Sequence, residues 1–169
     1  MREYFDMNHK KHISILLVLF FLSTSIFSIT EEQQKSVLDP ENANEARLNR
    51  LQPPEKILEI VGISPGMIVA EIGAGRGRYV VQLAVRVGET GKIYAEDIDS
   101  SALAYLENRC QRWGLENVET IVGEVTDPKL PQGELDLIFI ISSYHHFEDP
   151  VVLLQNARSA LKPEGGWQL

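Results

Sequence analysis

The chain has 169 residues with a net charge of -8, and 44% of its residues are hydrophobic. These values suit one domain with a real core, because a domain of this size buries about two-thirds of the surface of its unfolded chain. The acidic balance argues against a surface that binds nucleic acid. The single cysteine, Cys110, excludes an intramolecular disulfide and a cysteine-based zinc site, and we expect it to be a buried, inert thiol.

The amino-terminal segment has the pattern of a secretory signal peptide. Basic residues precede the run 13–22, which is apolar except for Ser14, and small residues follow it. We therefore assign residues 1–28 to a signal peptide; the alternative is an uncleaved membrane anchor over residues 13–29. The basic residues favour export of the rest of the chain to a periplasmic or secreted location. Contact with a membrane is expected only through this segment.

Residues 29–66 are predicted to form a linker and short helices that precede the main domain. The polar stretch 30–44 is typical of a linker, and the segments 45–51 and 55–61 are predicted to be helical. Gly62 is then expected to end the second helix.

From residue 67 onward, the sequence predicts alternating strands and helices. This alternation predicts an α/β fold, a Rossmann-like doubly wound parallel sheet with right-handed crossovers. The segment 162–166 is expected to be the turn after the last helix. The predicted strands are 67–72, 92–97, 118–122 and 135–141, and the predicted helices are 78–87, 100–113 and 151–161.

The turn after the first predicted strand carries three glycines at every second position, Gly73, Gly75 and Gly77, and Glu71 precedes them. Such a turn leaves backbone N–H groups free at the start of the helix and lets a ligand approach closely. Dinucleotide sites instead read G-x-G-x-x-G, which seats a pyrophosphate. A carboxylate beside the loop disfavours a pyrophosphate and suits a cofactor that carries a positive sulfonium and an amino group. The P-loop pattern is absent, so hydrolysis of a nucleoside triphosphate is not supported.

A second acidic position, Asp97, ends the next predicted strand. In doubly wound sheets, an acid about twenty residues beyond the glycine loop hydrogen-bonds ribose hydroxyls. Glu96 is expected to point to the opposite face of the strand, and Asp99 is expected to cap the following helix. Further along, Asp136 is expected to order a loop, and Asp149 to cap a helix.

These segments together resemble the class I S-adenosylmethionine-dependent methyltransferases. The resemblance spans roughly residues 51–166, and its motifs occur in the family's order. Segments 50–56 and 143–149 also resemble a subgroup of bacterial-type methyltransferases that carry export signals. The matching motifs are 71–77, Asp97, 123–125, 135–139 and 161–166.

The resemblance implies that residues 67–169 bind S-adenosylmethionine and that its methyl group is transferred to an acceptor. His145 and His146 follow the fourth strand, where methyl group and acceptor would meet. They serve as a general base, line the pocket or pack structurally, and no metal site is expected. The acceptor is a small molecule, a lipid or a protein. The implied cofactor-binding residues are Glu71, Gly73, Gly75, Gly77, Asp97 and Glu124, the last near the adenine.

A complete fold of this family has seven strands in the order 3-2-1-4-5-7-6, and about four of them are expected here. The fifth strand would begin at 167–169, where the chain ends. We therefore expect the fourth strand to be an exposed apolar edge, and the chain to be poorly soluble or partly unfolded. Two alternatives to an active methyltransferase are a non-catalytic adenosyl-binding remnant and an NAD-type oxidoreductase. The glycine spacing and Glu71 argue against the oxidoreductase.

Overall fold

The computed structural model describes residues 37–168. The segment 1–28, expected to be a signal peptide or anchor, lies outside the described residues, as does the first part of the expected linker. Within 37–168, none of the helices has the length and hydropathy that crossing a membrane requires.

Two short helices precede the sheet, α3 (Ala43–Leu51) and α4 (Pro54–Val61). The side chain of Asn42 caps α3, because its Oδ1 accepts hydrogen bonds from two N–H groups of the first turn at 3.0 Å each. α4 begins at a proline, which suits the first turn of a helix, and it ends at Gly62 in the left-handed conformation with φ 81°. The two predicted helices and the Gly62 stop are therefore confirmed.

The centre of the domain is a parallel sheet of five strands in the order β3-β2-β1-β4-β5. Each recorded pairing between neighbouring strands is parallel, so the connections cross over the faces of the sheet. The predicted α/β, Rossmann-like parallel sheet is confirmed. Its strands are β1 (Ile68–Ile72), β2 (Lys92–Asp97), β3 (Val118–Val122), β4 (Leu135–Phe139) and β5 (Leu161–Gln168).

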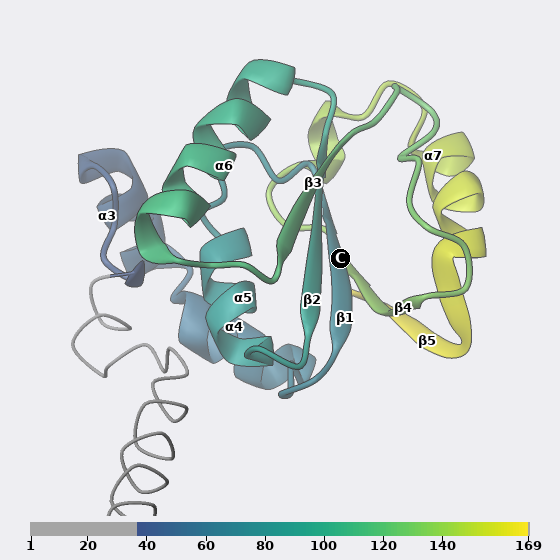
Figure 1. The fold of residues 1–169 in the computed structure, drawn as a ribbon. Coiled ribbons are helices and arrows are strands. Elements are labelled where there is room, and N and C mark those ends of the chain that lie inside the picture. Colours follow the sequence, from purple (N-terminus) through teal and green to yellow (C-terminus); the bar gives the residue numbers. More distant parts are fainter. Residues whose placement is uncertain (1–36, 169) are drawn as a thin grey trace, which may run out of the picture. The chain divides into compact units, whose positions relative to one another are not determined.

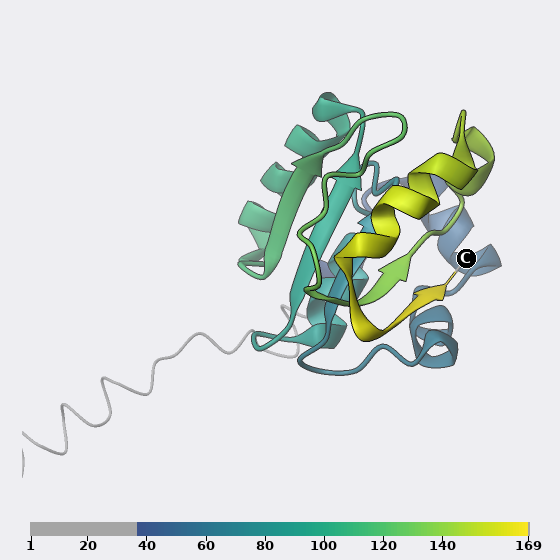
Figure 2. The ribbon, with the colours of Figure 1, turned by 90° about the vertical axis from the view of Figure 1, so that its right-hand side faces the viewer.

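Helices cover both faces of this sheet. In Figure 1, α5 (Val80–Val87) and α6 (Ser100–Trp113) lie on one side of the strands and α7 (Pro150–Ala157) lies on the other. Figure 2, turned by 90°, shows α7 lying across the face of the sheet. The predicted caps are confirmed, because Asp99 accepts from the first N–H groups of α6 and Asp149 from the N–H of Val152 in α7. Two short 3-10 helices, η1 (Tyr144–His146) and η2 (Arg158–Ala160), flank α7.

β5 corrects the prediction made for the end of the chain. The segment 162–166 was expected to be a turn, but it lies within β5, which pairs with β4 through Leu137 and Gly166. A proline and two glycines are typical of a turn, yet Gly165 lets the backbones approach, since a Cβ there would lie 2.8 Å from the carbonyl oxygen of Leu135. A register shift between Leu135 and Leu137 accommodates the irregularity. The sheet thus has five strands rather than about four, and β4 is an inner strand rather than the expected exposed edge.

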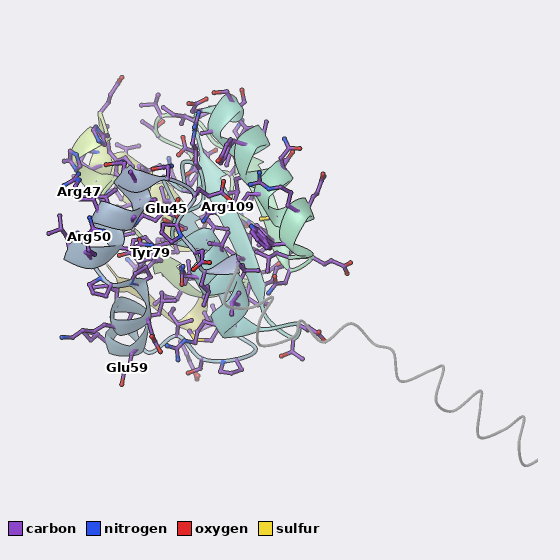
Figure 3. All side chains as sticks on the ribbon, turned by 90° about the vertical axis from the view of Figure 1, so that its left-hand side faces the viewer. Glu45, Arg47, Arg50, Glu59, Tyr79 and Arg109 are labelled. Atoms are coloured by element: carbon purple, nitrogen blue, oxygen red, sulfur yellow. The ribbon has the colours of Figure 1, made fainter. Side chains whose placement is uncertain are left out.

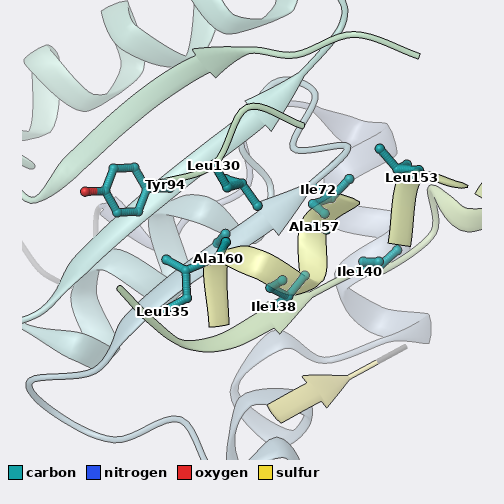
Figure 4. Packing of buried hydrophobic residues seen from close by; sticks show 10 residues of the cluster. Ile72, Tyr94, Leu130, Leu135, Ile138, Ile140, Leu153, Ala157 and Ala160 are labelled. Carbon is teal, nitrogen blue, oxygen red and sulfur yellow. The ribbon is translucent and has the colours of Figure 1, made fainter. Parts of the chain in front are cut away.

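One cluster of buried apolar residues lies between the sheet and α7 (Figure 4). Alternate residues of β1, Ala70 and Ile72, face this side of the sheet. They pack with Leu153 and Ala157 of α7, each at most 3% exposed. On the opposite side, Cys110 of α6 is buried, and burial raises the pKa of its thiol to about 11. The expected burial of the thiol is confirmed, and its raised pKa disfavours the reactive thiolate.

A buried ion pair attaches α3 to α6. Arg109 of α6 has no solvent exposure, and its Nη2 and Nη1 donate to the two carboxylate oxygens of Glu45 at 2.8 and 3.3 Å. Figure 3 shows the two side chains meeting between the helices. Glu41 lies beside this pair and accepts hydrogen bonds from Tyr105 and Arg112, and the Tyr105 hydroxyl and both arginines lower its pKa. The amino-terminal part of the described chain is therefore bound to the domain by paired charges.

Candidate functional site

A pocket of about 360 Å³ lies at the carboxyl ends of the strands. In open parallel sheets, ligands bind at this edge. Four acidic side chains line the pocket, and none of the described residues that line it is a lysine or an arginine. Apolar side chains complete the wall, among them Ile72 at the end of β1 and Leu153 of α7. The acidic residues are Glu96, Asp97, Glu124 and Glu148.

The glycine loop after β1 depends on glycine for two reasons. Gly73, Gly75 and Gly77 all have positive φ, at 76°, 54° and 82°. At two of them space is also limiting, since a Cβ on Gly73 would lie 2.4 Å from the Cβ of Ser143 and one on Gly77 would lie 2.2 Å from Cδ1 of Leu106. Gly75 faces open space, so its requirement is conformational alone. Only Gly73 lines the pocket; the other two shape the loop behind it.

Asp97 is held in place by the backbone around it. Its Oδ2 accepts from the N–H of Gly75 at 2.7 Å, and its Oδ1 accepts from the N–H of Asp99 at 2.9 Å. The carboxylate lines the pocket and is half-buried. The acid predicted from the end of the second strand is thus fixed at the pocket by the loop predicted from the glycines.

Glu71 lies behind the loop and is not among the residues that line the pocket. It is 3% exposed, and its Oε2 has no hydrogen-bond partner among the described residues. Burial raises the pKa of this carboxyl well above its ordinary value; the charge of Asp97 adds to the rise and that of Arg78 opposes it. Arg78 itself donates to Asn49 and to the carbonyl oxygen of Gln52 at 2.7 and 2.9 Å, which joins the loop to α3.

The remaining predicted residues lie at or near the rim. Glu124 lines the pocket, is exposed, and forms an ion pair with Lys129. His145 and His146 lie in η1 with ring centroids 3.9 Å apart, and both are exposed. Only His146 lines the pocket. Within the described part of the chain, no group of three or more histidine, cysteine, aspartate or glutamate side chains is placed to hold a metal ion.

Sequence reasoning missed two parts of the pocket wall. Glu96 was expected on the face away from Asp97, but both side chains line the pocket because it wraps around the end of β2. Ser143 is buried, and its Oγ donates to the carbonyl oxygen of Ile72 at 2.9 Å, which joins the loop after β4 to the end of β1. Glu96 had one usable signal, since an acidic residue in an otherwise apolar buried strand is rare. The sequence gives no comparable signal for Ser143.

Comparison with known proteins gives one clear family. A methyltransferase domain model matches residues 69–165. The chain belongs to this methyltransferase domain family. The structure of an S-adenosylmethionine-dependent methyltransferase from Aquifex aeolicus is 32% identical with a TM-score of 0.65, covering 81% of this chain and 69% of that one. S-adenosylmethionine is therefore the cofactor of the family to which the chain belongs.

Curated relatives of this methyltransferase domain are longer proteins. Nocamycin O-methyltransferase from Saccharothrix syringae is 31% identical over 111 residues, which are 65% of this chain and 39% of that protein. A ubiquinone/menaquinone biosynthesis C-methyltransferase from Hydrogenovibrio crunogenus is 28% identical over 109 residues, 64% of this chain and 43% of that protein. The matched part of the chain thus spans less than half the length of each of these two relatives.

The pocket of this methyltransferase domain fits such a cofactor. Four acidic side chains and no lining lysine or arginine among the described residues suit a ligand with a sulfonium and an ammonium group. The loop at Gly73 leaves no room for a side chain, so the backbone itself forms the wall there. The geometry agrees with the cofactor that the family implies.

Proposed function

We propose that this chain binds S-adenosylmethionine in the pocket at the carboxyl ends of the strands and promotes transfer of its methyl group to an acceptor. The observation that carries the proposal is the acidic lining of that pocket beside the glycine loop. An acidic wall favours a cationic ligand over one with a pyrophosphate. The same observation makes an NAD-type oxidoreductase the weaker alternative.

The roles of the residues follow from where they lie. Asp97 would hold the ribose hydroxyls, and its orientation is already set by two backbone N–H groups. Glu124 would lie near the adenine, because it lines the pocket from the loop after β3. Three of the predicted residues do not line the pocket and would act by shaping the loop: Gly75 and Gly77 within it, and Glu71 at the end of β1 just before it.

The cofactor supplies an electrophilic methyl group on a positive sulfur. The protein contributes mainly by holding donor and acceptor in line, which removes much of the entropic cost of their meeting. A base helps only if the acceptor must lose a proton. His146 is the better candidate for that base, because it lines the pocket and His145 does not.

We propose a small molecule as the acceptor. The two curated relatives named above are an O-methyltransferase and a C-methyltransferase, so the family likeness leaves the accepting atom open. The net charge of -8 disfavours a nucleic acid. Export by a signal peptide over 1–28, or anchoring by 13–29, is part of the same proposal, and sequencing the amino terminus of the mature protein would separate the two.

Isothermal titration with S-adenosylmethionine, S-adenosylhomocysteine and NAD tests the proposal. We expect binding of both adenosyl ligands and none of NAD. NAD binding without adenosyl binding would overturn it. Adenosyl binding without methyl transfer to any acceptor would instead support a non-catalytic adenosyl-binding module.

Asp97→Ala tests the assignment within the pocket. Because it removes a charge-assisted hydrogen bond, adenosyl affinity should fall by roughly tenfold or more. The matched control is Asp99→Asn, which keeps the helix cap and changes an acidic residue that does not line the pocket. Equal affinities for the two variants would remove the role given to Asp97.

A further inference from the structure

Glu96 is a buried acidic side chain that lines the pocket and has no ion-pair partner among the described residues. It is 2% exposed, yet it is one of the residues that line the pocket. Its carboxyl forms no ion pair with a described residue. Burying an unpaired carboxylate is costly, and a glutamine would fill the same volume without that cost. The fold therefore gains nothing from the acid itself.

The surrounding backbone leaves space for this carboxyl. Gly123, directly after β3, has no side chain, and a Cβ there would lie 1.9 Å from Oε1 of Glu96. This glycine has no positive φ, so the reason for it is room rather than conformation. On the other side, Ile72 is the register partner of Glu96 on β1 and also lines the pocket. A site for a carboxyl is thus built into the ends of three strands.

The charged and titratable groups around Glu96 are almost all acidic. Asp97 follows it on β2, and Asp127 lies in the loop after β3. Glu124 from the same loop, and His146 and Glu148 from the loop after β4, also line the pocket, whereas Leu153 of α7 brings no charge. Burial and the two aspartates raise the pKa of Glu96 to about 8, and the Gly73 N–H partly opposes this. Near neutral pH the free protein therefore holds a proton here.

We propose that Glu96 is a direct contact for the ligand in this pocket and that it loses its proton when the ligand binds. The ligand part that meets it carries N–H or O–H donors, such as the amino and hydroxyl groups of an adenosyl ligand. The O–H bond of the Glu96 carboxyl breaks, the proton passes to water or buffer, and the carboxylate left behind accepts a hydrogen bond from the ligand; no bond of the ligand itself changes. This inference rests on the proposed function, since it takes an adenosyl ligand as the occupant.

The proton release can be measured on the unmodified protein. Isothermal titration of S-adenosylhomocysteine at pH 7, in two buffers of different ionisation enthalpy, gives the number of protons released per ligand bound. We expect a substantial fraction of one proton for the wild type and a smaller fraction for Glu96→Gln. The ligand's own amino group contributes equally to both, so the difference belongs to Glu96.

The pH dependence of affinity gives a second readout. Between pH 6.5 and 8.5 the wild type should gain roughly tenfold more affinity than Glu96→Gln does, because only the wild type must lose this proton. Glu148→Gln is the matched control, since it removes an exposed acid from the same pocket wall, and it should keep the wild-type pH profile. A merely structural role for Glu96 would shift affinity without changing this profile.

The possible results separate the two proposals. Adenosyl binding with equal proton release from wild type and Glu96→Gln would overturn the role of Glu96 and leave the proposed function standing. If Glu96→Gln does not fold, a wild type that binds without releasing a proton beyond that of the ligand's amino group would overturn it equally. Failure of the wild type to bind any adenosyl ligand across this pH range would overturn both.

Discussion

Buried charges are treated differently in two regions of the molecule. Between α3 and α6, the buried Arg109 is paired with Glu45 through two hydrogen bonds. At the ends of β1 and β2, the buried Glu71 and Glu96 have no ion-pair partner among the described residues. The first region pairs its buried charges within the fold. The second leaves two acidic groups whose pKa is raised by burial. Of these groups only Glu96 lines the pocket, so the difference separates the paired charges that hold α3 on α6 from an acidic group that a ligand can reach.

This contrast bears on stability as well as on function. Removing one member of a buried pair strands the other, and that is among the most destabilising single changes. Removing a buried, unpaired acid relieves the fold instead, because the folded state no longer has to keep the group neutral. Local rules are broken most often at functional sites, which fits the location of Glu71 and Glu96 beside the glycine loop.

Arg109→Ala should have the largest effect of the changes considered. It leaves the Glu45 carboxylate buried without its partner, and the free energy of unfolding should fall by about 3–5 kcal/mol. Urea unfolding followed by circular dichroism measures this. Arg112→Ala is the control, since Arg112 pairs with Glu41 at the surface and its loss should cost less than about 1 kcal/mol. Similar losses for the two variants would contradict the view that the buried pair holds α3 in place.

Glu96→Gln should stabilise the folded protein at high pH, in contrast to the loss of stability expected for Arg109→Ala. The pKa of Glu96 is raised from 4.5 to about 8 in the folded protein, so the folded state holds a proton that the unfolded chain loses. The contribution of Glu96 to the free energy of unfolding is therefore fully present below pH 4.5. It is lost as the pH rises to about 8, by at most about 1.4 kcal/mol per pH unit. The variant should flatten this decline and be the more stable protein at pH 8.

Unfolding free energies measured from pH 5 to pH 8 check this sign. Glu71→Gln should act in the same direction, because burial also raises the pKa of Glu71. Glu148→Gln removes an exposed acid and should leave the slope unchanged. A Glu96→Gln variant with the wild-type slope would mean that the carboxyl is already ionised in the folded protein.

The sequence predicted the two regions unequally. Periodicity and glycine placement were enough for β2, α6 and β3, whose observed bounds match the predicted ones. The glycine loop and Asp97 were predicted next to each other because both follow the ends of parallel strands. The Arg109–Glu45 pair was not predicted, since 64 residues separate its members and nothing in either helix indicates the other.

Two misses have a common physical cause. Alternation along β2 placed Glu96 away from Asp97, but a pocket at the end of a strand reaches both faces. Turn chemistry placed Gly165 in a loop, but β5 uses its missing side chain for close approach to β4. In each case the local rule describes the residue correctly but does not include the contacts that form when the strands assemble into the sheet.

Asn49→Ala should have the smallest effect, and it tests whether the two regions are connected. Arg78 lies between them: it opposes the raised pKa of Glu71, and its Nε donates to Asn49 of α3 at 2.7 Å. Losing this one hydrogen bond should cost about 1 kcal/mol of unfolding free energy. The control is Asn44→Ala, which removes a long, exposed contact to Arg47 at 3.4 Å and should cost almost nothing.

The pH dependence of stability of the Asn49→Ala variant tests whether α3 influences Glu71. Arg78 keeps its bond to the carbonyl oxygen of Gln52 at 2.9 Å, so its charge should stay near Glu71 and the slope of stability against pH should match the wild type. A changed slope would mean that α3 sets the charge environment of the glycine loop through Asn49. The paired charges and the unpaired acids would then be one coupled system, because a change among the first would alter the proton affinity of the second.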